Sequence, residues 1–290
     1  MNDVGVATTL YEDRYFTVPD GLKLHYRDYP GSAERPPLLC LPGLTRNSRD
    51  FEELAERYSP RFRVLALEFR GRGMSEYDPV PARYTPPIYA QDVIELLDQL
   101  QIPQAVFVGT SLGGLVSMAV ALTQPQRIAA TILNDVGPVI NDVGVDRIKT
   151  YVGSGQRFKD WDEAGETIAR NTQAFDNYSH DDWVRMAKRN CREENGEIVF
   201  DYDPAIAEPF NTAPSTPRID LWPFFAAVAQ KPLLVVRGAR SDLLSAETLE
   251  KMHEAAPNMR SVVVPGVGHA PDLSEPEAVS AIDAFLSELG

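Results

Sequence analysis

The stretch AVFVGTSLGGLVSMAVAL, residues 105–122, changes character at a short run of small residues. Ala105–Val108 has the composition of a buried strand, and an apolar helical pattern follows from Leu112. Between them, Gly109-Thr110-Ser111-Leu112-Gly113 fits G-x-S-x-G, a sharp strand-to-helix turn that holds a serine in strained backbone geometry. Larger side chains at the two glycines would clash with the adjacent strand and helix. The pattern therefore predicts that Ser111 presents its hydroxyl beyond the end of the strand as a nucleophile.

Similar alternation of short apolar runs and longer helical patterns occupies much of the chain and predicts an α/β fold with a mostly parallel, eight-stranded sheet and helices on both faces. The turn Pro19-Asp20-Gly21 predicts a hairpin between the first two strands. Predicted strands span Arg14–Val18, Lys23–Asp28, Leu38–Leu41, Val64–Glu68, Ala105–Gly109, Ile128–Asn134, Leu233–Arg237 and Ser261–Val264, and predicted helices span Asp50–Tyr58, Ile88–Leu100, Leu112–Gln124, Ala246–Ala255 and Glu275–Leu289.

The alternation stops between about residues 137 and 230, where aromatic and charged residues are interrupted by prolines. Because strand-like runs resume at Leu233, we expect residues 137–230 to form a helical cap inserted into a core domain of residues 1–136 and 231–290. Aromatic side chains of this cap are candidates for the wall of a substrate pocket, although such residues are more often buried in packing. The candidates are Trp161, Trp183 and Trp222.

A serine nucleophile needs a base, and His269 is the predicted one among four histidines. His269 lies in Val267-Gly268-His269-Ala270-Pro271, just after the last predicted strand, at the sheet edge where the serine turn is expected. The other three have plainer interpretations as solvated or hydrogen-bonded side chains: His25 in an early strand, His180 in the cap and His253 in an acidic helix.

The imidazole needs an acid to orient it, and two aspartates compete for that role. Asp242 follows the strand Leu233–Arg237 on a loop at the same sheet edge, whereas Asp135 directly ends the strand Ile128–Asn134. We favour Asp242, because its loop adjoins the strand that carries the histidine. Asp135 remains a competitor.

An oxyanion hole is the last requirement, and backbone amides can supply it. The run Leu38–Leu41 is followed by Pro42-Gly43, a turn in which glycine lets the backbone approach a ligand closely. The predicted donors are the amides of Leu44 and of Leu112, the residue after the nucleophile.

Together these motifs resemble the α/β-hydrolase superfamily over nearly the whole chain. Pro42-Gly43 stands where that family usually has His-Gly, and Glu68-Phe69-Arg70-Gly71-Arg72-Gly73-Met74-Ser75 resembles its D-x-R-G-x-G-x-S segment, with glutamate replacing aspartate. The resemblance implies the α/β-hydrolase fold and the chain order Ser, Asp, His for the catalytic triad. Ser111 distinguishes the chain from dehalogenases and epoxide hydrolases of the superfamily, which use aspartate there. Esterases, enol-lactone hydrolases and carbon–carbon hydrolases of ring-fission products are more similar.

The charge and residue spacing of the chain exclude several classes of binding partner. The formal net charge of −14 opposes nucleic-acid binding, and no residue spacing indicates a metal site or a phosphate-binding loop, so no cofactor is expected. There is no apolar run long enough to cross a membrane and no secretory signal, and the two cysteines form no disulfide framework. We therefore expect a cytoplasmic protein that acts on a small-molecule ester, lactone or related carbonyl compound, without nucleic-acid or membrane partners.

Three functions fit these features. The first is hydrolysis of a carboxylic ester or lactone through an acyl-enzyme on Ser111. The second is hydrolysis of a carbon–carbon bond in a ring-fission dienoate with the same triad. That reaction would need an arginine in the cap for the substrate carboxylate, and the candidates are Arg147, Arg157, Arg189, Arg192 and Arg218. The third is a binding protein that has kept the fold without turnover.

Overall fold

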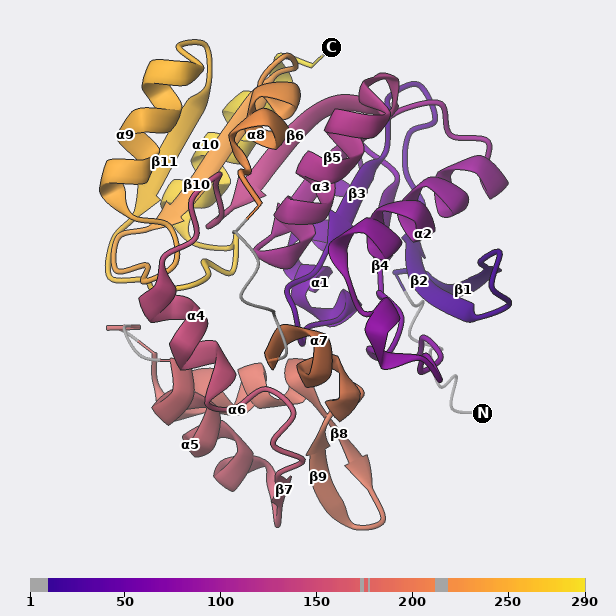
Figure 1. The fold of residues 1–290 in the computed structure, drawn as a ribbon, viewed down its shortest axis with the longest axis vertical. Helices are drawn as coiled ribbons and strands as arrows, with labels where there is room; N and C mark the ends of the chain where they lie inside the picture. The colour runs from indigo at the N-terminus through magenta and orange to yellow at the C-terminus, as the bar shows by residue number, and fades with distance from the viewer. Residues whose placement is uncertain (1–9, 173–174, 177, 212–218, 290) are drawn as a thin grey trace, which may run out of the picture.

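The computed structural model describes residues 10–172, 175–176, 178–211 and 219–289, and its centre is an eight-stranded sheet (Figure 1). The strand order is β1-β2-β4-β3-β5-β6-β10-β11. β1 and β2 form the predicted antiparallel hairpin, β2 is antiparallel to β4, and all later neighbours are parallel. The strands are β1 (Glu12–Thr17), β2 (Lys23–Tyr29), β3 (Leu38–Leu41), β4 (Val64–Leu67), β5 (Ala105–Thr110), β6 (Ile128–Asn134), β10 (Leu233–Gly238) and β11 (Arg260–Val264).

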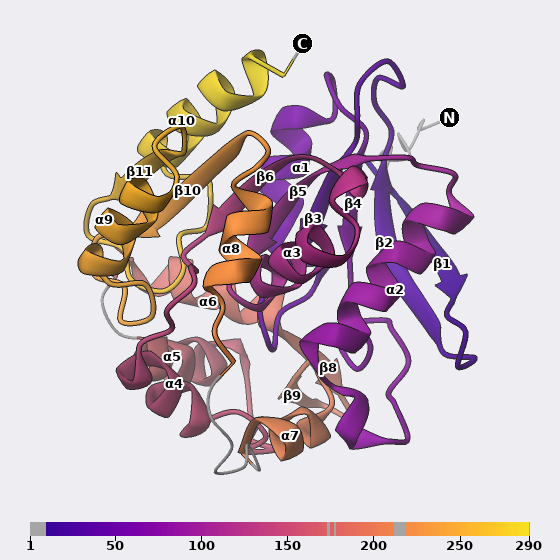
Figure 2. The ribbon, with the colours of Figure 1, turned by 45° about the horizontal axis from the view of Figure 1, so that its top comes forward.

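Helices cover both faces of the sheet, which confirms the predicted layers. Helices α2, α3, α8 and α9 lie on one face of the sheet, and α1 and α10 lie on the other (Figure 2). Their apolar side chains are buried against those faces. Central parallel strands such as β3 are buried on both sides, which explains their continuous apolar sequence. The helices are α1 (Glu52–Tyr58), α2 (Pro86–Gln99), α3 (Leu112–Thr123), α8 (Trp222–Val228), α9 (Ala246–Ala255) and α10 (Pro276–Ser287).

Residues between β6 and β10 form a separate layer at one end of the sheet (Figure 1). It contains helices and also a three-stranded antiparallel sheet, β7-β9-β8, that the sequence analysis did not predict. The interval also includes α8, whose Phe225 and Val228 are buried in the core beside α3. The division at residues 137–230 remains a prediction. The elements of this layer are α4 (Asp142–Lys149), β7 (Arg157–Phe158), α5 (Trp161–Thr172), α6 (His180–Asn190), β8 (Cys191–Glu194), β9 (Glu197–Phe200) and α7 (Ala207–Asn211).

Short 3-10 helices complete the described fold at Ser48–Phe51, Pro81–Arg83, Pro125–Arg127 and Pro204–Ile206. Among the described residues, none of the helices combines the length and the apolar character that crossing a membrane requires.

Candidate functional site

Ser111 lies in the predicted sharp turn between β5 and α3. Its backbone has φ 52° and ψ −113°, a conformation that non-glycine residues adopt only when the surrounding structure enforces it. The small neighbours are required sterically. A Cβ on Gly109 would lie 2.5 Å from Gly113 O, and one on Gly113 would lie 2.0 Å from Leu41 O in the adjacent strand. The glycines therefore let strand and helix approach closely enough to form the turn.

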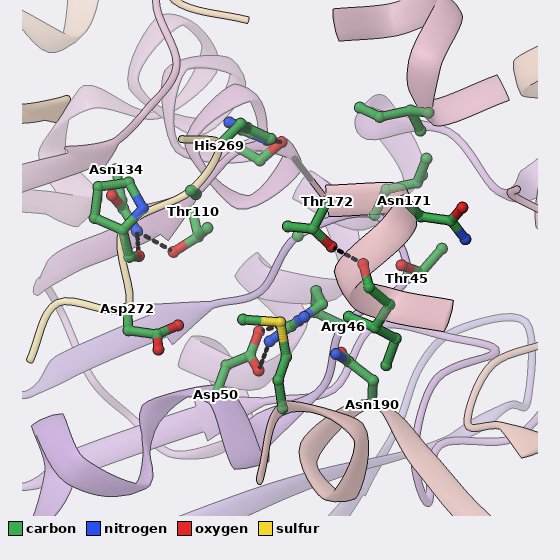
Figure 3. Close-up of a pocket in the computed structure, with 18 of the residues that line it drawn as sticks. Thr45, Arg46, Asp50, Thr110, Asn134, Asn171, Thr172, Asn190, His269 and Asp272 are labelled. Atoms are coloured by element: carbon green, nitrogen blue, oxygen red, sulfur yellow. Dashed lines mark hydrogen bonds and ion pairs between the residues drawn. The ribbon is translucent and has the colours of Figure 1, made fainter. Parts of the chain in front are cut away.

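His269 contacts the serine. Its Nε2 is 2.9 Å from Ser111 Oγ, although the two residues are 158 positions apart in the chain. Asn134 helps to join their loops, because its Nδ2 donates to Thr110 Oγ1 at 3.1 Å and to Pro271 O at 2.8 Å (Figure 3). The structure therefore brings together the predicted nucleophile and the predicted base.

The other three histidines make hydrogen bonds elsewhere, as their plainer interpretation required. His25 is buried between Glu68 and Asp13, His180 pairs with Asp162, and His253 contacts Ser261. His269 is thus the one imidazole at the serine.

The acid beside the imidazole is Asp135, and the preference for Asp242 is not met in the structure. His269 Nδ1 is 2.7 Å from Asp135 Oδ2. The Asp135 side chain is fully buried, and it also accepts from Gly238 N at 2.9 Å and from Ser241 Oγ at 2.5 Å. A positive φ of 57° at Asp135 turns the chain directly after β6. That turn and the two further donors fix the carboxylate against the imidazole.

Asp242 is held by another partner. Arg147 binds it through two parallel hydrogen bonds, from Nε at 2.6 Å and from Nη2 at 2.9 Å. Burial acts to raise the pKa of the Asp242 carboxyl, but the Arg147 guanidinium holds that pKa below its usual value. Arg147 comes from α4, 95 residues away, so the sequence around Asp242 gave no sign of this pairing.

The two predicted oxyanion donors belong to segments that adjoin the nucleophile. Leu112 is the first residue of α3, where a backbone N–H has no acceptor within the helix. Gly43 packs against the serine, since a Cβ at Gly43 would lie 3.9 Å from Ser111 Cβ. The following peptide is anchored by Arg72, whose Nε donates to Leu44 O at 2.9 Å. These positions are compatible with an oxyanion hole, which remains a prediction.

A cavity opens at Ser111 and His269, between the ends of the strands and the layer inserted after β6. The tryptophans that the sequence analysis offered as pocket residues do not line it. Trp161 and Trp183 pack in an apolar cluster of the inserted layer, and Trp222 packs beside Phe225 in the core. The inserted residues that do line the cavity are Arg147, Ile148, Tyr151, Ile168, Asn171, Thr172, Phe175, Met186, Asn190 and Phe200.

Among the arginines considered for a substrate carboxylate, Arg147 lines the cavity. Arg157 and Arg192 form ion pairs with acidic residues of β8 and β9, and Arg189 pairs with Glu53 and lies 3.5 Å from Asp272. Arg218 lies outside the described residues. Arg46, in the loop after β3, also lines the cavity, and no motif in the sequence points to it.

Comparison with known proteins agrees with this architecture. A curated relative in Cupriavidus necator, named 3-hydroxybutyrate-oligomer hydrolase, is 33% identical over 93% of this chain and 94% of its own length. A pimeloyl-[acyl-carrier protein] methyl ester esterase of Xanthomonas campestris is 28% identical over 88% of this chain and 96% of its own length.

A crystal structure of an alpha/beta hydrolase from Novosphingobium aromaticivorans is also similar, with 48% sequence identity and a TM-score of 0.91. The similarity covers 96% of this chain and 98% of that one. Residues 38–282, most of the chain, match the alpha/beta hydrolase family. The fold, the serine turn and these matches agree, and the chain belongs to the alpha/beta hydrolase family.

Proposed function

We propose that the protein hydrolyses a carboxylic ester or lactone through an acyl-enzyme on Ser111. The observation that carries this proposal is the continuous chain of contacts from Ser111 Oγ to His269 Nε2 and from His269 Nδ1 to Asp135. The names of the relatives support hydrolase activity, and the name of the Xanthomonas campestris relative refers to an ester. One observation is compatible with the alternative, carbon–carbon cleavage of a ring-fission dienoate: Arg147, a candidate for its substrate carboxylate, lines the cavity.

In this reaction Ser111 Oγ attacks the substrate carbonyl while His269 Nε2 takes its proton. Asp135 stabilises the imidazolium that forms, and the Leu44 and Leu112 amides stabilise the oxyanion. The oxyanion then collapses, and the leaving alcohol takes the proton from His269. Water, activated by the same imidazole, attacks the acyl-enzyme and releases the acid.

Covalent labelling tests the proposal. A fluorophosphonate probe is expected to modify Ser111 in the wild type, and Ser111→Ala is expected to abolish both labelling and p-nitrophenyl ester hydrolysis. Mass spectrometry of the labelled peptide locates the adduct. Absence of labelling in folded wild-type protein would contradict the proposal and favour a binding protein without turnover.

A substitution at Ser241 tests whether Asp135 acts as the acid of the triad, with a smaller expected effect. Its hydroxyl donates to Asp135 Oδ2, the same oxygen that faces His269. Ser241→Ala removes one hydrogen bond to a charged group, together with the acceptor of the Leu243 and Leu244 amides, and is expected to lower kcat about 10-fold. Ser241→Thr keeps the hydroxyl and is the matched control. Equal kcat values for wild type and Ser241→Ala would show that Gly238 N alone fixes the carboxylate.

A further inference from the structure

The cavity at Ser111 is lined by both apolar and polar side chains. Apolar lining comes from residues such as Ile148, Ile168 and Met186. The polar lining includes four side chains with N–H or O–H groups, which we call the donor cluster. They are Arg46, Arg147, Tyr151 and Asn190.

Arg46 packs against Gly43, in the loop after β3. Its Cγ lies 3.2 Å from the position of a Cβ on Gly43, and that position is 3.9 Å from Ser111 Cβ. Asp50 binds one edge of the guanidinium, through Nε at 2.6 Å and Nη2 at 2.5 Å. Among the described residues, Nη1 of Arg46 has no hydrogen-bond partner. The charge of this side chain is therefore balanced on one edge, while the other edge can donate to a ligand.

Arg147 is bound by an acid in the same way. Asp242 occupies its Nε and Nη2, and Nη1 donates to Asn171 O at 3.2 Å. Tyr151 also shares a side-chain hydrogen bond with Arg147, so one of the five N–H groups remains available to a ligand. Burial raises the pKa of Tyr151, and both Arg147 and Arg46 lie near enough to oppose that shift. The phenol therefore stays a neutral donor close to both guanidinium groups.

Asn190 adds a neutral amide to the cavity lining. The residue is 5% exposed, and within the described structure its Oδ1 is buried without a hydrogen-bond partner. Its amide points toward Arg46 at the cavity (Figure 3). Only the Nδ2 group of this amide can donate to an acidic ligand, because Oδ1 is an acceptor.

We propose that the donor cluster binds a carboxylate, so that the substrate carries a free carboxylate in addition to its scissile carbonyl. This inference rests on the proposed hydrolysis at Ser111. Two guanidinium edges, a phenol and an amide suit two carboxylate oxygens, because hydrogen bonds from charged donors to a carboxylate are the strong ones. The acids of the protein leave part of the donor cluster free. Asp50 binds the Nε and Nη2 edge of Arg46, and Asp242 binds the same edge of Arg147. Asp272 accepts a hydrogen bond from Tyr178.

Two matched esters measure the preference. The mono-p-nitrophenyl ester of glutaric acid carries the carboxylate, and its primary-amide analogue has nearly the same shape without the charge. We expect wild-type kcat/KM to favour the acid at least 10-fold. A ratio near one, or a preference for the amide, would overturn the inference.

Variants of the two arginines test whether these side chains cause the preference for the acid ester. Arg147→Met and Arg46→Met are each expected to lower kcat/KM for the acid about 10- to 100-fold, with less than 3-fold change for the amide. Arg157→Met is the matched control, because this arginine is half exposed and pairs with Glu194 and Glu197 outside the cavity. Equal losses on both esters would show that the arginines support the structure rather than recognise the carboxylate.

Asn190→Leu tests the cluster in a variant that is expected to fold, because Asn190 Oδ1 makes no hydrogen bond with the described residues. It is expected to leave the thermal midpoint unchanged or higher while reducing the preference for the acid. A lower midpoint together with an unchanged preference would remove Asn190 from the cluster.

A binding measurement separates this inference from the proposed function. Calorimetry on Ser111→Ala compares monomethyl glutarate with methyl 4-carbamoylbutanoate. Binding of the acid at least 10-fold tighter than the amide supports the carboxylate site even if wild-type protein hydrolyses neither p-nitrophenyl ester, in which case the proposed function fails alone. Equal affinities overturn the inference whatever the activity.

Discussion

Asp135→Asn is expected to lower kcat about 10⁴-fold while leaving the protein folded. The carboxylate is fully buried and faces His269 Nδ1 at 2.7 Å. An amide of the same shape lacks the charge that stabilises the imidazolium, and it can turn its NH₂ toward the ring, which favours the wrong tautomer. The measurement is kcat for a p-nitrophenyl ester, with circular dichroism to verify folding.

Asp242→Asn is the matched comparison, since the same chemical change is made on a neighbouring loop. Because Asp242 binds Arg147 and not the imidazole, we expect kcat on an uncharged ester to fall less than 10-fold. If Asp242→Asn caused the 10⁴-fold loss and Asp135→Asn a small one, the acid assignment drawn from the structure would be reversed.

The sequence predicted the sheet edge at which both aspartates lie. It did not predict which of the two side chains contacts His269. Asp242 was favoured because β10 adjoins the strand before His269. However, β6 lies between β5, which carries the serine, and β10, so Asp135 is also close to both loops. A usable signal was its position directly after a buried strand, because aspartate tolerates the positive φ that a turn there requires. The partner of Asp242 lies on α4 and was not visible locally.

The sheet and its helices were predictable because their signal is local. β3, β6 and α9 have the predicted bounds, and most other core elements differ from the predicted bounds by one or two residues. Continuous apolar runs mark buried parallel strands, whatever their neighbours are. The layer between β6 and β10 gave a weaker signal. Its strands, such as β7 with two residues, are too short to show a period of two.

The pocket residues could not be predicted for a related reason. Trp161 and Trp183 are large and aromatic, but the inserted layer uses them to build its own small core. The cavity is lined instead by Arg46, Arg147 and Asn190, which come from three separate segments. Which polar side chains converge on one cavity depends on the packing of the inserted layer, and no spacing in the sequence expresses it.

Gly113→Ala is expected to destabilise the protein by on the order of 4 kcal/mol, or to prevent soluble expression. The added Cβ would lie 2.0 Å from Leu41 O and 2.6 Å from Leu41 C. Both atoms belong to the backbone of β3, so no rotation of a side chain can relieve the overlap, and strand and helix must separate. Thermal denaturation measures the effect, with an expected fall of about 10 °C in Tm.

Gly155→Ala separates this clash from the general cost of replacing glycine. Gly155 has φ +62°, and nothing lies within 4 Å of a Cβ built there, so the expected cost is about 1 kcal/mol from backbone strain alone. If Gly113→Ala melts within 2 °C of wild type, the close approach of β3 and α3 is not what the glycine provides. Because β3 leads directly into Pro42-Gly43 and Leu44, a strand displaced by the new methyl group would also move the predicted oxyanion donor. Any soluble Gly113→Ala protein should therefore lose esterase activity even at temperatures where it remains folded.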